Sequence, residues 1–198
     1  MSQRSRKIEK QPILIKIRNT YIWLFMLFII SCNSGSTERS VSDRDDELTG
    51  RVIKVLDGDT YDVLLPGNKT LRVRMEGIDA PERGMPFYRV SKNYLKSLCA
   101  NKVVKVRITN KDQYERYIGF TYLEDGTELS HAMIEAGLAW HFKKYNSDSD
   151  LSDLEIKARN LQKGFWQDKN PMPPWENRRL HRLGISTKDS FDIKEGHR

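Results

Sequence analysis

Acidic side chains flank two predicted turns in the first half of the chain. The stretch DGDT contributes Asp59, and the stretch DAPE contributes Asp79 and Glu82. Clustered carboxylates repel one another unless a cation or a guanidinium neutralises them, and hard oxygen ligands favour Ca²⁺ or Mg²⁺ over thiophilic metals. Arg74 lies shortly before DAPE and supplies a planar guanidinium that suits a phosphate. A divalent ion and an arginine beside a spare carboxylate make a phosphodiester-cleaving site, in which Glu82 would orient or deprotonate water.

Each of these residues also has an ordinary structural interpretation. Asp57 fits simple turn chemistry beside a glycine and would at most tune the cation site. A single aspartate such as Asp59 or Asp79 most often caps a turn, and an isolated Arg116 is usually a surface cation. The combination of the acids with Arg74 favours the chemical interpretation.

The hydrophobic pattern predicts the elements that would hold these residues. Apolar and polar residues alternate from Thr49 onward, which is typical of half-buried strands. Further along, apolar residues recur at helical spacing before Gly137 and before Gly164, and glycine commonly ends a helix. The predicted order is strands at 49–56, 59–65 and 69–78, a helix at 90–101, strands at 102–110 and from 117 to a turn at 125–126, and helices at 127–139 and 148–166.

This order predicts an α+β domain over residues 49–170, a five-stranded OB-fold β-barrel with about three packed helices. In an antiparallel meander, the start of the second strand and the end of the third converge at one barrel mouth, so Asp59, Asp79 and Glu82 become neighbours. Residues 171–198 are rich in proline and charge, and we expect them to form a loosely ordered tail.

Residues 1–31 have the pattern of a signal peptide. They hold six Lys or Arg and one acid, which accounts for most of the formal net charge of +7, followed by the apolar run YIWLFMLFII. The next motif, IISC, resembles a bacterial lipobox and predicts lipidation of Cys32; an uncleaved anchor and plain secretion are the alternatives. Residues 32–48 have the composition of a flexible tether. We therefore expect an exported protein, either a cell-envelope lipoprotein held on the membrane by Cys32 or a secreted one.

Cysteine and histidine give no further chemistry. Cys99 lies in the apolar-periodic stretch YLKSLCA and is expected to be a buried small residue rather than a nucleophile. His131 and His141 have no partners at the spacing of a zinc site, so we expect them at the surface or in caps.

The motifs resemble those of the thermonuclease, or staphylococcal-nuclease-like, family. The matching segments are VLDGDTYDV, RVRMEGIDAPE, DQYERYIGFTY and MIEAGLAW, in the family's order and approximate spacing over about residues 50–166. The resemblance implies an OB barrel with three helices, Ca²⁺-dependent hydrolysis of DNA and RNA, and 3′-phosphorylated products. Carried over by position, the implied roles are calcium ligands at Asp59, Asp79 and the backbone carbonyl of Ala80, a general base at Glu82, and binding of the scissile phosphate at Arg74 and Arg116.

Two aromatic residues and two departures from the family pattern also concern the substrate. Tyr114 and Trp140 resemble positions where a ring stacks on a base, with packing at the rim as the alternative. Gln113 stands where a basic residue is common, and Glu115 stands where glycine is common. An acid at position 115 would pair with Arg116 or repel phosphate, and the loop would lose glycine's freedom at positive φ.

The sequence thus predicts a monomeric, Ca²⁺-dependent endonuclease that acts on DNA or RNA outside the cytoplasm. The alternative is a noncatalytic OB-fold module on an envelope lipoprotein, because the same fold can bind nucleic acid or protein after losing its acids. The enzyme is favoured because the chain keeps the complete set of implied site residues, which are Asp59, Asp79, Glu82, Arg74 and Arg116.

Overall fold

The computed structural model describes residues 47–186, which all lie within the unit of the chain from Arg44 to Arg198. The predicted signal peptide, Cys32 and nearly all of the predicted tether lie outside the described residues. No helix within residues 47–186 is both long and apolar enough to cross a membrane. The described part contains the whole predicted domain and the beginning of the predicted tail.

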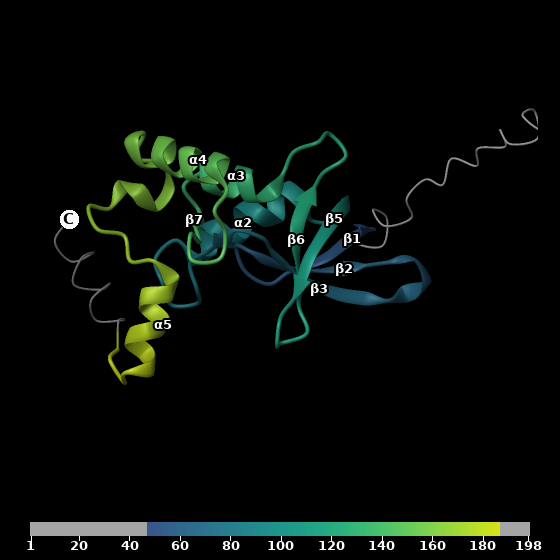
Figure 1. The fold of residues 1–198 in the computed structure, drawn as a ribbon, viewed down its shortest axis with the longest axis horizontal. Helices are drawn as coiled ribbons and strands as arrows, with labels where there is room; N and C mark the ends of the chain where they lie inside the picture. Colours follow the sequence, from purple (N-terminus) through teal and green to yellow (C-terminus); the bar gives the residue numbers. More distant parts are fainter. Residues whose placement is uncertain (1–46, 187–198) are drawn as a thin grey trace, which may run out of the picture. The chain divides into compact units, whose positions relative to one another are not determined.

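Five strands close into a barrel, as the sequence predicts (Figure 1). They are β1 Glu47–Val55, β2 Thr60–Leu64, β3 Thr70–Met75, β5 Val103–Lys111 and β6 Tyr117–Tyr122. β1 pairs antiparallel with β2 and with β5, and β2 pairs antiparallel with β3. β6 pairs antiparallel with β5 and parallel with β3, and this last pairing completes the closed OB-type barrel.

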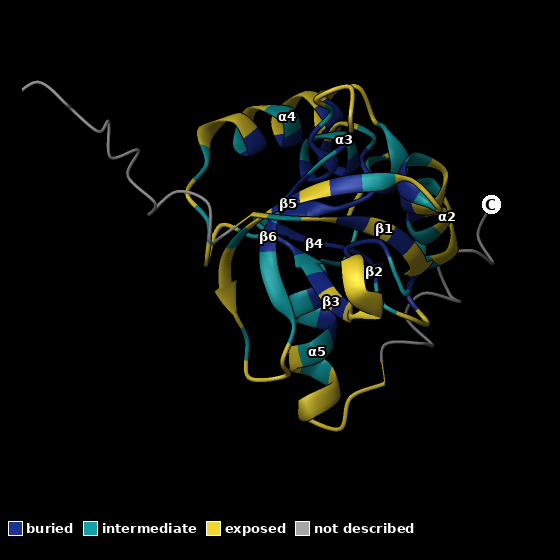
Figure 2. Cartoon of the chain, turned by 90° about the vertical axis from the view of Figure 1, so that its right-hand side faces the viewer, coloured by how far each residue is buried: buried dark blue, intermediate teal, exposed yellow. Residues whose placement is uncertain are grey.

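Alternate side chains of the strands fill the barrel, and Figure 2 shows buried and exposed positions following one another along them. On β3, the side chains of Leu71, Val73 and Met75 are all buried, as the period of two predicts. Tyr61 is fully buried as well, and its hydroxyl lies 2.8 Å from that of Thr121. The buried phenol is therefore hydrogen-bonded inside an otherwise apolar core.

Three helices follow in the order that the sequence predicts. They are α2 Tyr88–Cys99, α3 Leu129–Glu135 and α4 Ser149–Asn160, and α3 lies against α4 (Figure 1). The carboxylates of Glu128 and Asp148 accept hydrogen bonds from the first backbone N–H groups of α3 and α4, so both helices begin at capping acids. Cys99 is buried at the end of α2, as predicted, and burial raises the pKa of its thiol to about 12.

A separate two-stranded ladder fixes the chain just after β3. Its strands are β4 Ile78–Asp79 and β7 Trp140–His141, which pair antiparallel so that Asp79 lies opposite Trp140. The sequence predicts a surface or capping position for His141, and the surface position is wrong. His141 is 2% exposed, because β7 packs against α4. The His141 ring nitrogens lie 3.0 Å from the Ser152 hydroxyl and 3.1 Å from the Asn146 amide oxygen.

The sequence predicts a loosely ordered tail from residue 171 onward. That prediction is wrong for residues 174–182, which form a fourth helix, α5 Pro174–Arg182. Proline stands in its first turn with Glu176, and basic residues stand in its last turn, as helix ends prefer. The ring of Trp175 stacks on Phe142, with the centroids 5.3 Å apart and 5° between the planes. Contact with a distant segment therefore stabilises α5, and a scan for hydrophobic periodicity does not detect such contacts.

Gly137 and Gly164 allow the backbones of two chain segments to lie in direct contact where the segments cross. Both have positive φ, 66° and 55°, and the Gly137 carbonyl accepts a hydrogen bond of 3.0 Å from the backbone N–H of Phe165. A Cβ added to Gly164 would lie only 2.0 Å from the Gly137 carbonyl oxygen. Position 164 therefore requires glycine for both its conformation and its space.

We predict that Gly164→Ala destabilises the domain by roughly 2–5 kcal/mol, because the cost of a left-handed conformation adds to the cost of overpacking against the Gly137 carbonyl. The matched control is Gly126→Ala, since Gly126 also has positive φ, 84°, but nothing lies within 4 Å of an added Cβ. The control should lose only about 1–2 kcal/mol. Urea unfolding of both variants measures the difference, and equal losses would contradict the crossing contact.

Candidate active site

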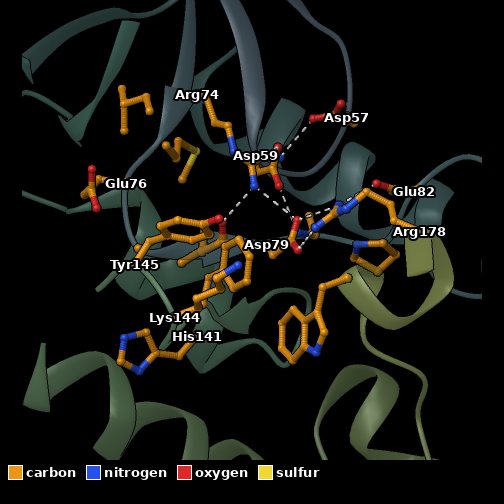
Figure 3. Close-up of a pocket in the computed structure, with 18 of the residues that line it drawn as sticks. Asp57, Asp59, Arg74, Glu76, Asp79, Glu82, His141, Lys144, Tyr145 and Arg178 are labelled. Carbon is orange, nitrogen blue, oxygen red and sulfur yellow. Dashed lines mark hydrogen bonds and ion pairs between the residues drawn. The ribbon is translucent and has the colours of Figure 1, made fainter. Parts of the chain in front are cut away.

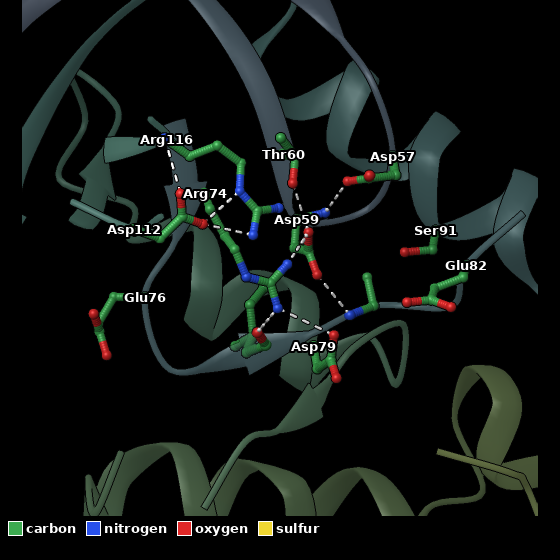
Figure 4. A network of polar contacts seen from close by, with 12 residues as sticks. Asp57, Asp59, Thr60, Arg74, Glu76, Asp79, Glu82, Ser91, Asp112 and Arg116 are labelled. Carbon is green, nitrogen blue, oxygen red and sulfur yellow. Dashed lines mark hydrogen bonds and ion pairs between the residues drawn. The ribbon is translucent and has the colours of Figure 1, made fainter. Parts of the chain in front are cut away.

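Arg74 joins the two aspartates that the sequence predicts as calcium ligands. The strand register pairs Thr60 with Arg74, so the arginine emerges beside the start of β2. Its Nη1 donates a hydrogen bond of 2.6 Å to Asp59, and its Nη2 donates one of 3.1 Å to Asp79 (Figure 4). Nη2 also donates to the backbone carbonyl of Ile78 at 3.3 Å. The structure thus brings Asp59 and Asp79 together, as the predicted meander requires.

Asp59 is 3% exposed, and both of its carboxylate oxygens have partners. Besides Arg74, the Thr60 hydroxyl donates to Oδ1 at 2.8 Å, and the backbone N–H of Ala80 donates to Oδ2 at 2.9 Å. Asp57 accepts a hydrogen bond of 3.2 Å from the Asp59 backbone, which is the turn chemistry considered above. Asp59 therefore ties the DGDT turn directly to the DAPE segment.

Gly58 permits the close approach of α2 to this turn. A Cβ at this position would lie 1.9 Å from the Ser91 hydroxyl and 2.7 Å from the Ala80 side chain. Ser91 is itself fixed, since its hydroxyl donates a hydrogen bond of 2.8 Å to the Leu138 carbonyl. Helix packing therefore sets the position of the DGDT turn, and the glycine has a steric reason beyond turn formation.

Arg178 on α5 binds the other side of Asp79, and sequence analysis missed it (Figure 3). Its Nη2 lies 2.6 Å from Asp79 Oδ2, and its Nη1 lies 3.3 Å from Asp79 Oδ1 and 2.5 Å from Glu82 Oε1. The amide of Asn177 donates to the other Glu82 oxygen at 3.4 Å. Asp79 and Glu82 are therefore linked through a guanidinium. The prolines that precede WENRR were a helix-start signal, but no local pattern announces this distant partner.

Burial and mutual repulsion perturb the acids of this group. Burial and the nearby Asp59 raise the pKa of Asp57 to about 7. Burial also opposes ionisation of Asp59, yet Arg74 and the Ala80 N–H hold its pKa below the ordinary value. For Asp79, burial raises the pKa, and the hydrogen bond from Arg178 only partly offsets that effect. At Asp79 the effect of burial on the pKa therefore outweighs that of the two guanidiniums.

The donor set fits a hard divalent cation by its chemistry. Asp59 and Asp79 offer carboxylate oxygens, and the backbone carbonyl of Ala80 follows directly in the chain. Within residues 47–186, however, no three His, Cys, Asp or Glu side chains gather closely enough to hold a metal ion alone. The protein therefore offers a cation two carboxylates and a carbonyl here. Glu82 binds Arg178 instead.

Arg116 reaches the same cleft from the turn between β5 and β6 (Figure 4). Its guanidinium is oriented by Asp112, whose Oδ2 lies 2.7 Å from both Nε and Nη2. The other oxygen of Asp112 accepts hydrogen bonds from the backbone N–H groups of Tyr114 and Arg116, at 2.9 and 3.0 Å. The turn thus holds Arg116 through one carboxylate that belongs to the turn itself.

Glu115 does not pair with Arg116, which rules out the first of its two expected effects and leaves repulsion of phosphate as a prediction. Its carboxylate pairs with Lys111 instead, and the side chain is 79% exposed. The backbone of Glu115 adopts φ 63°, the left-handed conformation that glycine takes freely. A non-glycine residue pays about 1–2 kcal/mol for this conformation, so the turn keeps its shape at a modest cost in stability.

The two predicted substrate-contacting rings differ in accessibility. Tyr114 is 71% exposed on the cleft wall, with the Arg116 guanidinium 5.6 Å from its ring centroid, so one face is open to a base. Trp140 is 4% exposed and stacks on Phe165, with the centroids 3.5 Å apart and 9° between the planes. The structure therefore favours the packing alternative for Trp140.

One cleft of about 1510 Å³ connects these parts. Its wall contains the Asp59, Arg74 and Asp79 group on one side and Arg116 on another. The remaining lining includes six basic residues, namely Arg83, Lys143, Lys144, Arg159, Arg179 and Arg182, together with acids such as Glu76, Glu155 and Glu176. The cleft exceeds the usual volume of a small-molecule site, and its basic and acidic side chains are nearly balanced in number.

The OB barrel and the group of Arg74 with Asp59 and Asp79 define the structural class of this protein. Comparison with known proteins gives the family. The sequence pattern of the family described as Staphylococcal nuclease homologue matches residues 72–168. The chain is 41% identical over 129 residues to an uncharacterized endonuclease of Escherichia coli, covering 65% of this chain and 84% of that protein. It is 34% identical over 143 residues to a micrococcal nuclease of Shigella flexneri, covering 67% and 82%. The chain belongs to the staphylococcal nuclease family.

The ion pair between Asp112 and Arg116 gives a prediction about pH. Burial alone would raise the pKa of Asp112, but hydrogen bonds from the Arg116 backbone and side chain hold it below its usual range. A lowered folded-state pKa stabilises the fold above the unfolded pKa of about 4, and this contribution disappears as pH falls below that value. We predict that Asp112→Asn is less stable than wild type at pH 7 and that the difference shrinks toward pH 2. Urea unfolding across this range measures it, and a difference independent of pH contradicts the assignment.

Proposed function

We propose that the protein is a calcium-dependent endonuclease that hydrolyses phosphodiester bonds of DNA, RNA or both and leaves 3′-phosphorylated products. Family membership supports the nuclease class. The observation that carries the proposal is the Arg74 guanidinium shared by two buried aspartates from separate turns, Asp59 and Asp79. Such a group holds concentrated charge in a fixed geometry at the wall of a large cleft, as catalysis of phosphate chemistry requires.

In the proposed mechanism, Arg74 and Arg116 bind oxygens of the scissile phosphate. A guanidinium has five N–H donors, and Arg74 contacts three acceptors, so donors remain for a phosphate oxygen. The phosphodiester gains negative charge in its pentacoordinate state, and the two guanidiniums therefore stabilise that state more than the ground state. Calcium held by Asp59, Asp79 and the Ala80 carbonyl would supply further positive charge at the same place.

Glu82 is the proposed general base, and its position at the rim gives it access to water. Its side chain is 36% exposed, unlike the buried Asp59 and Asp79. A carboxylate there accepts a proton from water as the water attacks phosphorus. Its oxygens also contact Arg178 and Asn177, which compete with water for the same carboxylate.

We also propose export from the cytoplasm, with residues 1–31 as signal peptide and Cys32 as lipid anchor, and action as a monomer with Tyr114 stacking on a base. The basic segment, the apolar run and the IISC motif support the export proposal. The exposed ring of Tyr114 beside Arg116 supports the stacking proposal.

We predict that Glu82→Gln lowers the rate of DNA cleavage by about 10²–10⁴-fold, because the amide cannot accept the proton. Cleavage of a labelled duplex by the full chain in Ca²⁺ is followed on a gel. The matched control, Glu124→Gln, changes an exposed glutamate outside the cleft and should leave the rate unchanged. Products should resist polymerase extension until a phosphatase removes the 3′-phosphate.

Three results would separate this function from the alternative. Cleavage that continues unchanged with a chelator contradicts calcium dependence. Full activity of Glu82→Gln contradicts the role of Glu82. Tight binding of nucleic acid by the wild type without any cleavage supports the noncatalytic module instead.

A further inference from the structure

Arg178 lies between Asp79 and Glu82 and brings positive charge to both carboxylates. Its two terminal nitrogens contact both oxygens of Asp79 and one oxygen of Glu82, at distances from 2.5 to 3.3 Å (Figure 3). Asp79 is 1% exposed, whereas the Arg178 side chain is 35% exposed, so the guanidinium enters from the open side of the cleft. The arginine thus covers the solvent-facing side of a carboxylate whose other partner is Arg74.

The two guanidiniums that hold Asp79 differ in how firmly the fold fixes them. Arg74 stands within β3, between paired strands of the barrel. Arg178 stands on α5, outside the strands of the barrel. Figure 1 shows α5 apart from the paired helices α3 and α4. The contacts of α5 include the stack of Trp175 on Phe142 and the buried side chain of Asn177.

A divalent cation at Asp79 would compete with the Arg178 guanidinium for the same carboxylate. Asp79 already contacts two guanidiniums, and a divalent ion would add further positive charge a few ångströms from both. Binding of a cation at Asp79 therefore favours departure of one guanidinium, and Arg178 can leave without breaking a strand of the barrel, whereas Arg74 stands within β3. Departure of Arg178 also removes a partner from Glu82.

We infer that α5 is an autoinhibitory helix whose Arg178 competes with the divalent cation for Asp79, so that cation binding releases Arg178 and frees Glu82. This inference rests on the proposed function for the identity of the cation. With Arg178 docked, one Glu82 oxygen is held in an ion pair and both Asp79 oxygens contact guanidinium donors. With Arg178 released, both carboxylates are available at once, which couples cation binding to activation of the base.

Calcium affinity of the full chain, measured by titration calorimetry, tests the competition without reference to activity. Arg178→Gln should bind Ca²⁺ at least about tenfold more tightly than wild type, because a bidentate charged contact no longer competes. Arg179→Gln is the matched control on the same helix, since Arg179 pairs with the exposed Glu176. Its Ca²⁺ affinity should stay within about twofold of wild type. Asp79→Asn should abolish the binding and so locate the site.

A second variant undocks α5 without changing any charge. Trp175→Ala removes the stack on Phe142 and should also tighten Ca²⁺ binding, although less than Arg178→Gln. In the wild type, Ca²⁺ should increase deuterium uptake across residues 174–182, because the helix loses its ion pair. In Arg178→Gln, the uptake should be high from the start and respond little to Ca²⁺.

The outcomes distinguish this inference from the proposed function. Equal Ca²⁺ affinity of wild type and Arg178→Gln, or weaker binding by the variant, overturns the competition and leaves the nuclease proposal standing. Unchanged deuterium uptake of α5 when Ca²⁺ binds the wild type also overturns it. If neither the wild type nor any variant binds Ca²⁺, the calcium-dependent function itself fails, and the inference fails with it.

Discussion

Burial of two carboxylates at one end of the barrel is the constraint on which the rest of the site depends. An ionised aspartate removed from water is tolerated only when charge and hydrogen bonds compensate it, and Asp59 and Asp79 are both almost fully buried. Arg74 provides that compensation for both, because the register of β2 and β3 places it next to Asp59. The same arrangement leaves little freedom for any of the three side chains.

The surrounding elements reinforce this geometry from outside the barrel. The ladder of β4 with β7 holds Asp79 opposite Trp140, and β7 is in turn held by α4. Glu155 of α4 is 2% exposed, accepts a hydrogen bond from the His141 backbone and pairs with Lys143 and Arg159. A buried charge in the helical layer therefore fixes the strand that fixes the site.

The sequence predicted the parts of this structure that local chemistry determines. Alternation predicted the barrel strands, apolar residues at helical spacing predicted three helices, and the motif spacing brought Asp59 and Asp79 together. The prediction failed where the deciding contact is distant. The stack of Trp175 on Phe142 and the ion pair of Arg178 with Asp79 join segments far apart in the chain, so the prolines before α5 were its only local signal. Glu115 takes a conformation that its residue type disfavours, and only the turn around it decides that.

The parallel pairing of β3 with β6 determines when the site can form during folding. Val73 pairs with Tyr117, so the barrel cannot close until α2 and β5 have been made and have returned to the first three strands. Contacts that span such long loops raise the contact order and slow the folding reaction. Arg116, directly before β6, joins the cleft only at this closing step. A partly synthesised chain thus carries its acids but not Arg116, and the cleft is completed only when the barrel closes.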